Sequence, residues 1–460
     1  MDIRALRLAI RGTVVTRDDA HYETLRAGLL WNGRKPDRFP EIVVKVKDAA
    51  DVQAAVRFAA ANGKRISVRG GGHHWSGIAL QEGVVLDLAD MNALSIDPEA
   101  RIARAQPTVT NGRLAAALAE YGLAFPAGHC ASVPLSGYLL GGGFGWNTGA
   151  WGIACHNVES VDVVLANGSL ITASASENAD IFWAARGAGP AFFGVVTEYR
   201  LRLYSLPKAI RTSVWTYRPD RVEEVEEWMS RTMRRVPRNV EFTAVMSSAP
   251  PPLAGRSEKV LTAVATIFAE TEEEAGETLA IIETGAPEDP LDIKLALETP
   301  FDVLYRIIGQ FFPEGARFVA DTNWSDDPAM LMKRMAEAVA IAPSPESFAL
   351  AVVLPPFSPD IMPDGAFSRV GPAFSCAYAI WRDPGADAEN VAWLRNTSDR
   401  LAPVSLGHYV GEADLERPER AHGSFSPAAC ERLKGLRRKF DPACLFHHPG
   451  LATQPLLKAG

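Results

Sequence analysis

The sequence lacks the features that define several large classes of protein. It has no stretch of about 18 apolar residues, so no membrane-spanning helix is predicted. It has no basic run or arm and its net charge is -8, so a nucleic-acid partner is not expected. The N-terminal segment MDIRALRLAIRG has no apolar core of the kind that secretory signals carry. The simplest expectation is a globular protein of the cytoplasm.

Cysteine is scarce as well. The 460 residues contain five cysteines, too few and too scattered for a disulfide framework, which agrees with a reducing compartment. The adjacent His73 and His74 cannot easily share a metal, because neighbours on an extended chain point to opposite faces. No set of three or four ligands has the spacing of a zinc site, so no metal is expected.

Length and composition predict more than one domain. The chain is longer than one hydrophobic core usually supports. Its composition shifts near Ser205-Leu206-Pro207. We expect a first domain at 1–206 with its core at 36–206, a second at 207–415, and a segment at 416–460 that returns to the first.

Hydrophobic periodicity predicts the elements of the first domain. Asp48 has the side chain and position of a helix N-cap, and Gly63 ends the helix that follows. Asn167-Gly168 has the composition of a hairpin turn. Another helix is expected at 111–120, and strands are expected at 41–47, 66–68, 84–88, 102–105, 158–164, 170–173 and 192–203.

The second half of the chain has a different pattern, in which strands and helices indicate one antiparallel sheet with helices on one face. The fold class is therefore α+β. The end of the chain predicts a basic helix within 425–446 that stops at Asp441-Pro442. Helices are expected near 221–236, 271–283 and 327–341, and strands near 240–247, 259–268, 347–354 and 373–381.

Two glycine runs interrupt the first domain. Gly70-Gly71-Gly72 directly follows a predicted strand, where glycines let the backbone approach a ligand and present its N–H groups to an anion. The second run extends from Gly137 to Gly145, and the whole segment 130–152 around it is expected to be too rich in glycine for a helix. Together the runs fit a long cofactor with a pyrophosphate, and tight structural turns are the alternative. The pattern is not that of a Rossmann site.

Several motifs, taken together, resemble one family closely. The sequence is similar to the berberine-bridge-enzyme-like branch of the vanillyl-alcohol-oxidase flavoprotein superfamily, whose members have a PCMH-type FAD domain. The resemblance covers the first domain nearly end to end and the middle of the chain only weakly. The motifs that carry it are HYETLRAGLLWN, VRGGGHHWSG, AGHCASVPLSGYLLGGGFGW, DIFWAARGAGPAFFGVVTEYRLRLY and ERLKGLRRKFDPACLF.

The resemblance implies that FAD is held by two covalent bonds. In the family, the histidine after the glycines is bonded to the flavin 8α-methyl group, which places that role on His73. The cysteine before the second run is bonded to flavin C6 in bicovalent members, which places that role on Cys130. Read from composition alone, Cys130 is a buried small hydrophobe. The residues expected to bind the cofactor are Arg69, Gly70, Gly71, Gly72, His73, His74, Gly77, Gly128, Cys130, Ser132, Gly137, Gly141, Gly142, Gly143, Phe144 and Val196.

Some positions depart from the family pattern where substrate or oxygen should approach the flavin. Leu135 stands at the position expected to line the route of oxygen, on the ring face opposite the substrate. The family's closing Tyr-x-Asn segment has Gly411 in place of the asparagine. No substrate is therefore implied. The remaining departures are Pro134, Ser368-Arg369-Val370, Ala429 and Cys430.

The family likeness predicts an FAD-dependent oxidoreductase that takes a hydride from an alcohol, sugar hydroxyl or amine of a small molecule. The electrons would pass to oxygen or another acceptor.

Tyr409 is the candidate catalytic base if its pKa is lowered. The alternative is that Tyr409 is only a packed aromatic residue, and His408 and Glu412 stay open as other candidates for the base. The antiparallel sheet of the second domain should cover the substrate cavity. An oxidative cyclase and a non-catalytic flavin-binding protein are the other hypotheses. The sequence predicts no oligomeric state.

Overall fold

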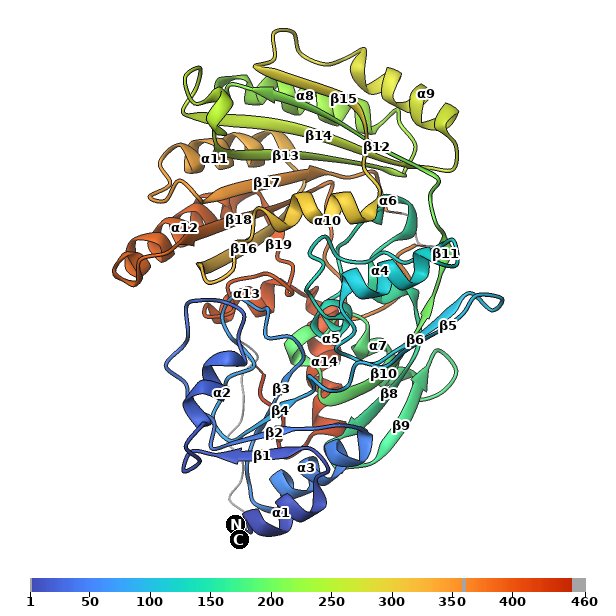
Figure 1. Ribbon diagram of the computed structural model, residues 1–460, viewed down its shortest axis with the longest axis vertical. Coiled ribbons are helices and arrows are strands. Elements are labelled where there is room, and N and C mark those ends of the chain that lie inside the picture. The colour runs from blue at the N-terminus through green and yellow to red at the C-terminus, as the bar shows by residue number, and fades with distance from the viewer. Residues whose placement is uncertain (1, 358–360, 449–460) are drawn as a thin grey trace.

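The computed structural model describes residues 2–357 and 361–448. Two parts are stacked along the long axis (Figure 1). The lower part contains two small sheets and a two-stranded pair, and the upper part contains one large sheet. The segment after residue 407 runs back from the upper part into the lower one. The expected return of residues 449–460 lies outside the described residues.

The first small sheet has the order β1-β2-β4-β3, in which β2, β4 and β3 are parallel and β1 is antiparallel. The Asp48 side chain accepts hydrogen bonds from the N–H groups of Ala50 and Asp51, as the predicted N-cap requires. This sheet and its helices comprise α1 (Ile3–Ala9), β1 (Thr13–Thr16), α2 (Tyr22–Gly28), β2 (Ile42–Lys45), α3 (Ala49–Ala61), β3 (Ile66–Arg69) and β4 (Val84–Asp87).

The second small sheet is antiparallel, with the order β5-β6-β10-β8-β9. Gly168 has a φ of +77° in the predicted turn between β8 and β9. The strands are β5 (Leu94–Asp97), β6 (Ile102–Ala105), β8 (Val158–Leu165), β9 (Leu170–Ser174) and β10 (Gly194–Arg202), and β7 (Leu123–Ala124) pairs with β11 (Tyr204–Ser205).

The expectation that the glycine-rich segment 130–152 forms no helix is wrong. Two short helices form there, α5 (Leu135–Leu140) and α6 (Thr148–Trp151). Leu135, Tyr138 and Leu139 of α5 are buried in the core beside the second small sheet, and this packing outweighs the low helix propensity of Gly137. The other helices of this part are α4 (Asn111–Ala119), which was predicted, and α7 (Ala179–Ala185), which was not.

The upper part contains one antiparallel sheet of eight strands. The sequence predicted a single antiparallel sheet for this part of the chain. Its order is β15-β12-β14-β13-β17-β18-β16-β19. Several of its strands were not predicted, namely β12, β15, β16 and β19. The strands are β12 (Ala209–Tyr217), β13 (Val240–Ser248), β14 (Lys259–Ala269), β15 (Asp292–Glu298), β16 (Arg317–Ser325), β17 (Phe348–Val353), β18 (Ala373–Trp381) and β19 (Ser405–Gly407).

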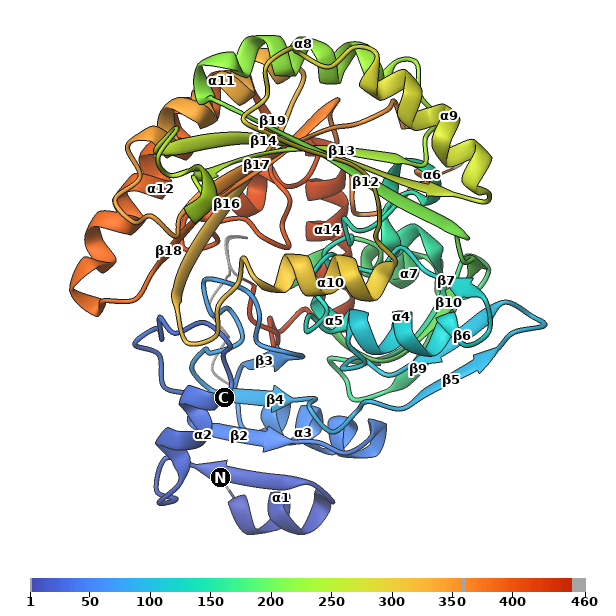
Figure 2. The same ribbon diagram turned by 45° about the horizontal axis from the view of Figure 1, so that its top comes forward.

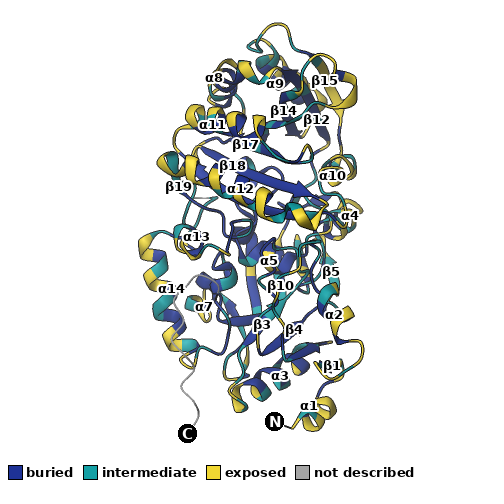
Figure 3. Cartoon of the chain, turned by 90° about the vertical axis from the view of Figure 1, so that its left-hand side faces the viewer, coloured by how far each residue is buried: buried dark blue, intermediate teal, exposed yellow. Residues whose placement is uncertain are grey.

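Four helices arch over the outer face of this sheet (Figure 2). They bury a large apolar core against it, and their outer faces are exposed (Figure 3). The inner face of the sheet looks toward the lower part, with α10 on that side. The four outer helices are α8 (Val222–Met233), α9 (Glu272–Glu283), α11 (Pro328–Ala340) and α12 (Asp387–Leu401). Of these, α12 was not predicted, and neither was α10 (Phe301–Gly309) on the inner side.

The last described segment ties the two parts together. After β19 the chain passes between them and forms α13 (Pro418–Gly423) and α14 (Pro427–Phe440). The basic tail helix is thus confirmed, and its C-cap is Asp441. Beyond it, Phe446 forms a parallel bridge with Ile66 of β3. Among the helices of residues 2–357 and 361–448, none combines the length and apolar composition needed to span a membrane.

Candidate active site

A long cavity begins between the two small sheets and extends to Phe312, which precedes β16, and to the turn after β19. The space between its walls amounts to about 1670 Å³, with open solvent at its mouth included. Its inner end is lined by β3, β10 and the returning chain at Phe446 and His447. Its outer end is lined by Trp31, Phe312 and Glu412. An extended ligand can therefore reach from one part of the molecule to the other.

The first glycine loop forms one wall of this cavity. A Cβ atom at Gly70 would collide with Ser136 Oγ, and one at Gly71 would collide with the Pro134 ring. Gly72 has a φ of +68° and lies against the Leu29 carbonyl. These close approaches hold the loop against the segment before α5. Both glycine runs therefore border the same space, as the sequence predicted.

His73 follows this loop and lines the cavity. Its ring stacks on Trp31 with 5.5 Å between the centroids. Burial, and to a lesser degree the nearby Arg69, lowers the pKa of His73 to about 4. The imidazole is therefore neutral at neutral pH, and a ring nitrogen keeps a lone pair that can act as a nucleophile. His74 also lines the cavity, and burial lowers its pKa to about 4.

Cys130 lines the same cavity from the segment before the second glycine run. Burial, with a smaller contribution from Glu412, raises the pKa of Cys130 to about 12. The side chain is therefore a thiol and not a thiolate at neutral pH. His129, its neighbour, is instead held by Glu241, with 2.9 Å between Nε2 and the carboxylate. The fold thus brings His73 and Cys130 to one space, although they come from loops far apart in the sequence.

Tyr409 lines the cavity, but its hydroxyl group is engaged elsewhere. It accepts a hydrogen bond of 3.2 Å from the Gly143 N–H. Burial raises the pKa of Tyr409 above its ordinary value. The condition under which Tyr409 was a candidate base, a lowered pKa, is therefore not met, and Tyr409 is a neutral phenol at neutral pH. His408 lies outside the cavity lining; its Nδ1–H donates to the Thr322 carbonyl at 2.6 Å, and burial lowers its pKa.

Several expected site residues lie behind the cavity wall. Arg69 donates hydrogen bonds to the Leu29 and Gly71 carbonyls and pairs with Asp87, so it holds the first loop in shape. The side chain of Leu135, the first residue of α5, is fully buried in the core and does not line the cavity, so the expectation that it borders the route of oxygen to the flavin is wrong. Gly77, Gly128, Gly142, Gly143 and Phe144 also lie outside the lining.

The other expected residues do line the cavity: Gly70, Gly71, Gly72, Ser132, Gly137, Gly141 and Val196. Sequence reasoning missed the aromatic wall of the outer end, formed by Trp31, Trp75 and Phe312. Trp31 and Trp75 lie within the motifs that carry the family likeness, but neither was assigned a role in the site. Nothing in the sequence around Phe312 points to a site, because this residue reaches the cavity from the other part of the molecule.

The donor groups of the cavity fit a dinucleotide such as FAD. Neither lysine nor arginine lines it within the described residues, so backbone N–H groups would have to hold a pyrophosphate. The N–H groups of Gly70, Gly71, Gly72 and His73 have no hydrogen-bond acceptor among residues 2–357 and 361–448. Gly137 has open space where a Cβ would stand, so a side chain there would occupy the cavity.

Comparison with known proteins identifies the class. A family model described as "FAD binding domain" matches residues 40–174. The chain is 30% identical over 424 residues to the FAD-linked oxidoreductase nodO of Hypoxylon pulicicidum, with 92% of this chain and 93% of that protein covered. It is 39% identical over 216 residues to (R)-6-hydroxynicotine oxidase of Paenarthrobacter nicotinovorans, with 47% and 46% covered.

Solved structures share the whole fold. The structure of 6-hydroxy-D-nicotine oxidase from Arthrobacter nicotinovorans matches with a TM-score of 0.83, 24% identity and 96% and 98% of the two chains covered. Berberine bridge enzyme from Eschscholzia californica matches with a TM-score of 0.81, 19% identity and 100% and 99% covered. The chain belongs to the berberine-bridge-enzyme-like FAD-linked oxidoreductases. It is an enzyme that binds FAD.

Proposed function

We propose that this enzyme holds FAD by covalent bonds to His73 and Cys130 and removes a hydride from an alcohol, sugar hydroxyl or amine of a small organic substrate. The observation that carries the proposal is the position of His73 and Cys130 on one cavity. When bound, FAD supplies an acceptor for two electrons that no protein side chain offers. Oxygen or another acceptor would then receive the electrons.

The neutral imidazole of His73 supports the first bond, because a protonated ring has no free lone pair. Cys130 has to lose its proton before sulfur can add to the flavin, since the thiolate is the nucleophile. The attachment through Cys130 should therefore be the slower of the two. The protein's part is to hold both nucleophiles on the wall of a cavity that is largely apolar.

We also propose a division of labour along the chain. Residues 1–206 would bind FAD, residues 207–415 would roof the substrate end with the large sheet, and the segment 416–460 would close the FAD end. The lining supports this division, because the outer end includes Phe312 and Glu412 whereas the inner end includes β3, β10 and Phe446. Tyr409 would contribute a neutral phenol to the wall.

The test of covalent attachment is acid precipitation followed by mass spectrometry. The colour should stay in the pellet, and the intact mass should exceed the 49.7 kDa of the chain by one FAD. The single changes Cys130→Ala and His73→Ala should each keep flavin through the remaining bond, and the double change should release it. Cys155→Ala is the matched control, because Cys155 is buried but lies outside the cavity lining. Release of all flavin by the unaltered protein would overturn the proposal.

Hydride removal is tested by anaerobic mixing with a panel of alcohols, sugars and amines. A substrate should bleach the flavin absorbance, and readmission of air should show whether oxygen restores it. If no member of a broad panel bleaches the flavin while its attachment is intact, the reaction proposed here is wrong although the cofactor is present.

A further inference from the structure

Glu412 is the acidic side chain of the cavity. Within the described residues, no aspartate, lysine or arginine lines this space. A carboxyl group in such a site has no cationic partner from the protein. Burial accordingly raises the pKa of Glu412, and the Tyr378 hydroxyl offsets this only in part. The group is therefore available to a ligand that brings a positive charge or a proton.

The position of this carboxyl group is held from two sides. The Tyr378 hydroxyl on β18 donates a hydrogen bond of 3.1 Å to Oε2 of Glu412. The backbone N–H of Glu412 donates at 3.1 Å to the Tyr409 carbonyl, which closes a tight turn. Cys376 on β18 and His129 on the loop before α5 also lower the pKa of Glu412 in part. Glu412 in turn raises the pKa of the neighbouring Cys130.

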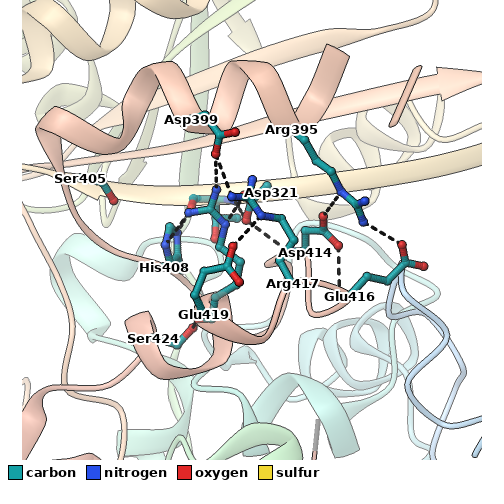
Figure 4. Close-up of polar contacts among 12 residues, drawn as sticks. Asp321, Arg395, Asp399, Ser405, His408, Asp414, Glu416, Arg417, Glu419 and Ser424 are labelled. Atoms are coloured by element: carbon teal, nitrogen blue, oxygen red, sulfur yellow. Dashed lines mark hydrogen bonds and ion pairs between the residues drawn. The ribbon is translucent and has the colours of Figure 1, made fainter. Parts of the chain in front are cut away.

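The turn that carries Glu412 is fixed to β16 by buried polar groups (Figure 4). The N–H of Tyr409 donates to Thr322 Oγ1 at 2.9 Å, and the N–H of Asp414 donates to Asp321 Oδ1 at 3.1 Å. Arg420 pairs with Asp321 at 3.0 Å, and both side chains are buried. A carboxyl group fixed in this way is preorganised for a ligand, since its placement costs little further ordering.

Aromatic rings form the walls near this group. Trp75 stacks against Phe312 with 6.1 Å between centroids and meets Tyr378 edge-on at 5.7 Å. Trp31, Trp75 and Phe312 all line the cavity. The faces of such rings attract cations within about 6 Å. Aromatic walls with one carboxyl group are a common arrangement for an organic cation.

The same lining disfavours other substrate classes. A sugar needs several hydrogen-bonding side chains to match its hydroxyl groups, whereas Trp31, Trp75 and Phe312 at the outer end present mainly apolar ring surface. An acidic substrate would need a cation, and no lysine or arginine lines the described cavity. Leaving such polar groups unpaired in a buried site costs about 1–3 kcal/mol each. An apolar molecule with one amino group has no such cost.

We propose that the substrate is an apolar amine, and that Glu412 is the catalytic base that binds its ammonium group and takes one proton from it. This proposal rests on the proposed function and narrows it. Proton transfer converts a buried ion pair into a neutral acid and a neutral amine, which a desolvated cavity favours. The α-carbon of the neutral amine then gives a hydride to oxidised FAD, so its C–H bond is lost, a C=N bond of an iminium forms, and the flavin is reduced by two electrons.

The test uses two probes of equal shape that cannot be oxidised, because neither has an α-hydrogen. They are 2-phenylpropan-2-amine and 2-phenylpropan-2-ol, titrated into the flavin-loaded enzyme by calorimetry. The amine should bind at least about tenfold more tightly than the alcohol, as expected for a hydrogen bond to a charged group. Glu412→Gln should remove this preference and leave the affinity for the alcohol within about twofold. It should also slow flavin reduction by benzylamine about 10²–10⁴-fold.

The matched control is Glu419→Gln, which removes an exposed carboxylate from the same segment outside the cavity. It should leave the preference unchanged. Equal binding of both probes, binding of neither, or an unchanged preference in Glu412→Gln would overturn the proposal. If FAD is attached and an alcohol bleaches it while amines do not, the proposed function stands and the role of Glu412 is wrong. If the protein carries no FAD, the proposed function itself is wrong.

Discussion

Asp321 and Arg420 form a buried ion pair at the junction of the two parts of the molecule. Their side chains are 1% and 7% exposed, and 3.0 Å separates the charged atoms. Arg420 also donates to Nε2 of His408 at 3.0 Å, while Nδ1–H of that ring donates to the Thr322 carbonyl. One arginine therefore satisfies both a carboxylate and a neutral imidazole. Removing it leaves both of these groups without their partner.

At the residue scale we predict a large loss of stability for Arg420→Met. The free energy of unfolding should fall by about 3–5 kcal/mol, because a buried charge is left uncompensated. Urea denaturation followed by circular dichroism measures this change. Arg417→Met is the control, since its partners Asp399 and Glu419 are more than half exposed, and it should cost less than about 1 kcal/mol.

Adding Asp321→Asn to Arg420→Met should recover part of the loss, because the unpaired charge is then gone. Equal, small effects of Arg420→Met and Arg417→Met would show that the central ion pair contributes no more than a surface pair. No recovery in the double variant would show that Asp321 acts mainly through its hydrogen bond to the Asp414 N–H.

At the scale of elements, α5 combines two tasks. Its buried residues Leu135, Tyr138 and Leu139 fix it in the core, while Gly137 faces the cavity. A Cβ atom added to Gly137 would meet nothing within 4 Å. The glycine is thus not required by the packing of the protein, and its open surface is available to the cofactor.

We therefore predict that Gly137→Ala folds normally but takes up FAD poorly. The thermal midpoint of the apoprotein should be unchanged or slightly raised, since alanine is the better helix former by about 1 kcal/mol. The affinity of the apoprotein for FAD should fall at least about tenfold, measured by quenching of flavin fluorescence. Gly276→Ala in α9, also without neighbours within 4 Å, is the control and should leave FAD binding unaltered. Full FAD uptake by Gly137→Ala would mean that the cofactor does not pass along α5.

Elements with regular apolar periodicity could be predicted, and those with buried polar residues could not. The strands that were predicted for the first domain, and the helices α8, α9 and α11, lie near their expected positions, whereas β1, β5, β7 and β11 were not predicted. In β16, Asp321 and Asn323 are buried, so the strand does not alternate between apolar and polar residues. In α12, the polar residues Asn390, Thr397 and Ser398 are buried, so they interrupt the apolar periodicity that would predict a helix.

The candidate site also has parts that the sequence could predict and parts that it could not. The glycine runs predicted the loops, and the family resemblance singled out His73 and Cys130. The role of Leu135 was wrong because a helix turns this side chain into the core, while its neighbour Val133 lines the cavity. Glu412 was left open, because its isolation from other charges depends on contacts with β18 that sequence spacing cannot show.

At the scale of the whole molecule, buried histidines make stability depend on pH. His156 and His448 are 6% and 4% exposed, and burial lowers their pKa values to about 3 and about 4. The unfolded chain binds these protons below about pH 6.5 whereas the folded protein does not, so lower pH favours unfolding. Each histidine contributes up to about 1.4 kcal/mol per pH unit.

We predict that the free energy of unfolding falls steadily from pH 6.5 to pH 5, a window above the titration of ordinary carboxylates. Urea denaturation at half-unit intervals measures the slope. His156→Phe should reduce the slope by up to about 1.4 kcal/mol per pH unit, the contribution of one proton. His21→Phe changes an exposed position and should leave the slope unchanged. A stability that is constant over this range would contradict the assignment of these rings as neutral.

The returning segment has a consequence for the order in which the protein matures. Tyr409 and Glu412 complete the outer end of the cavity, and Phe446 and His447 complete the inner end. Because a ribosome makes the chain from its N-terminus, the two glycine loops and both nucleophiles exist long before either end of the cavity is closed. FAD capture is therefore an event that follows translation, and a nascent chain released before residue 446 should emerge colourless.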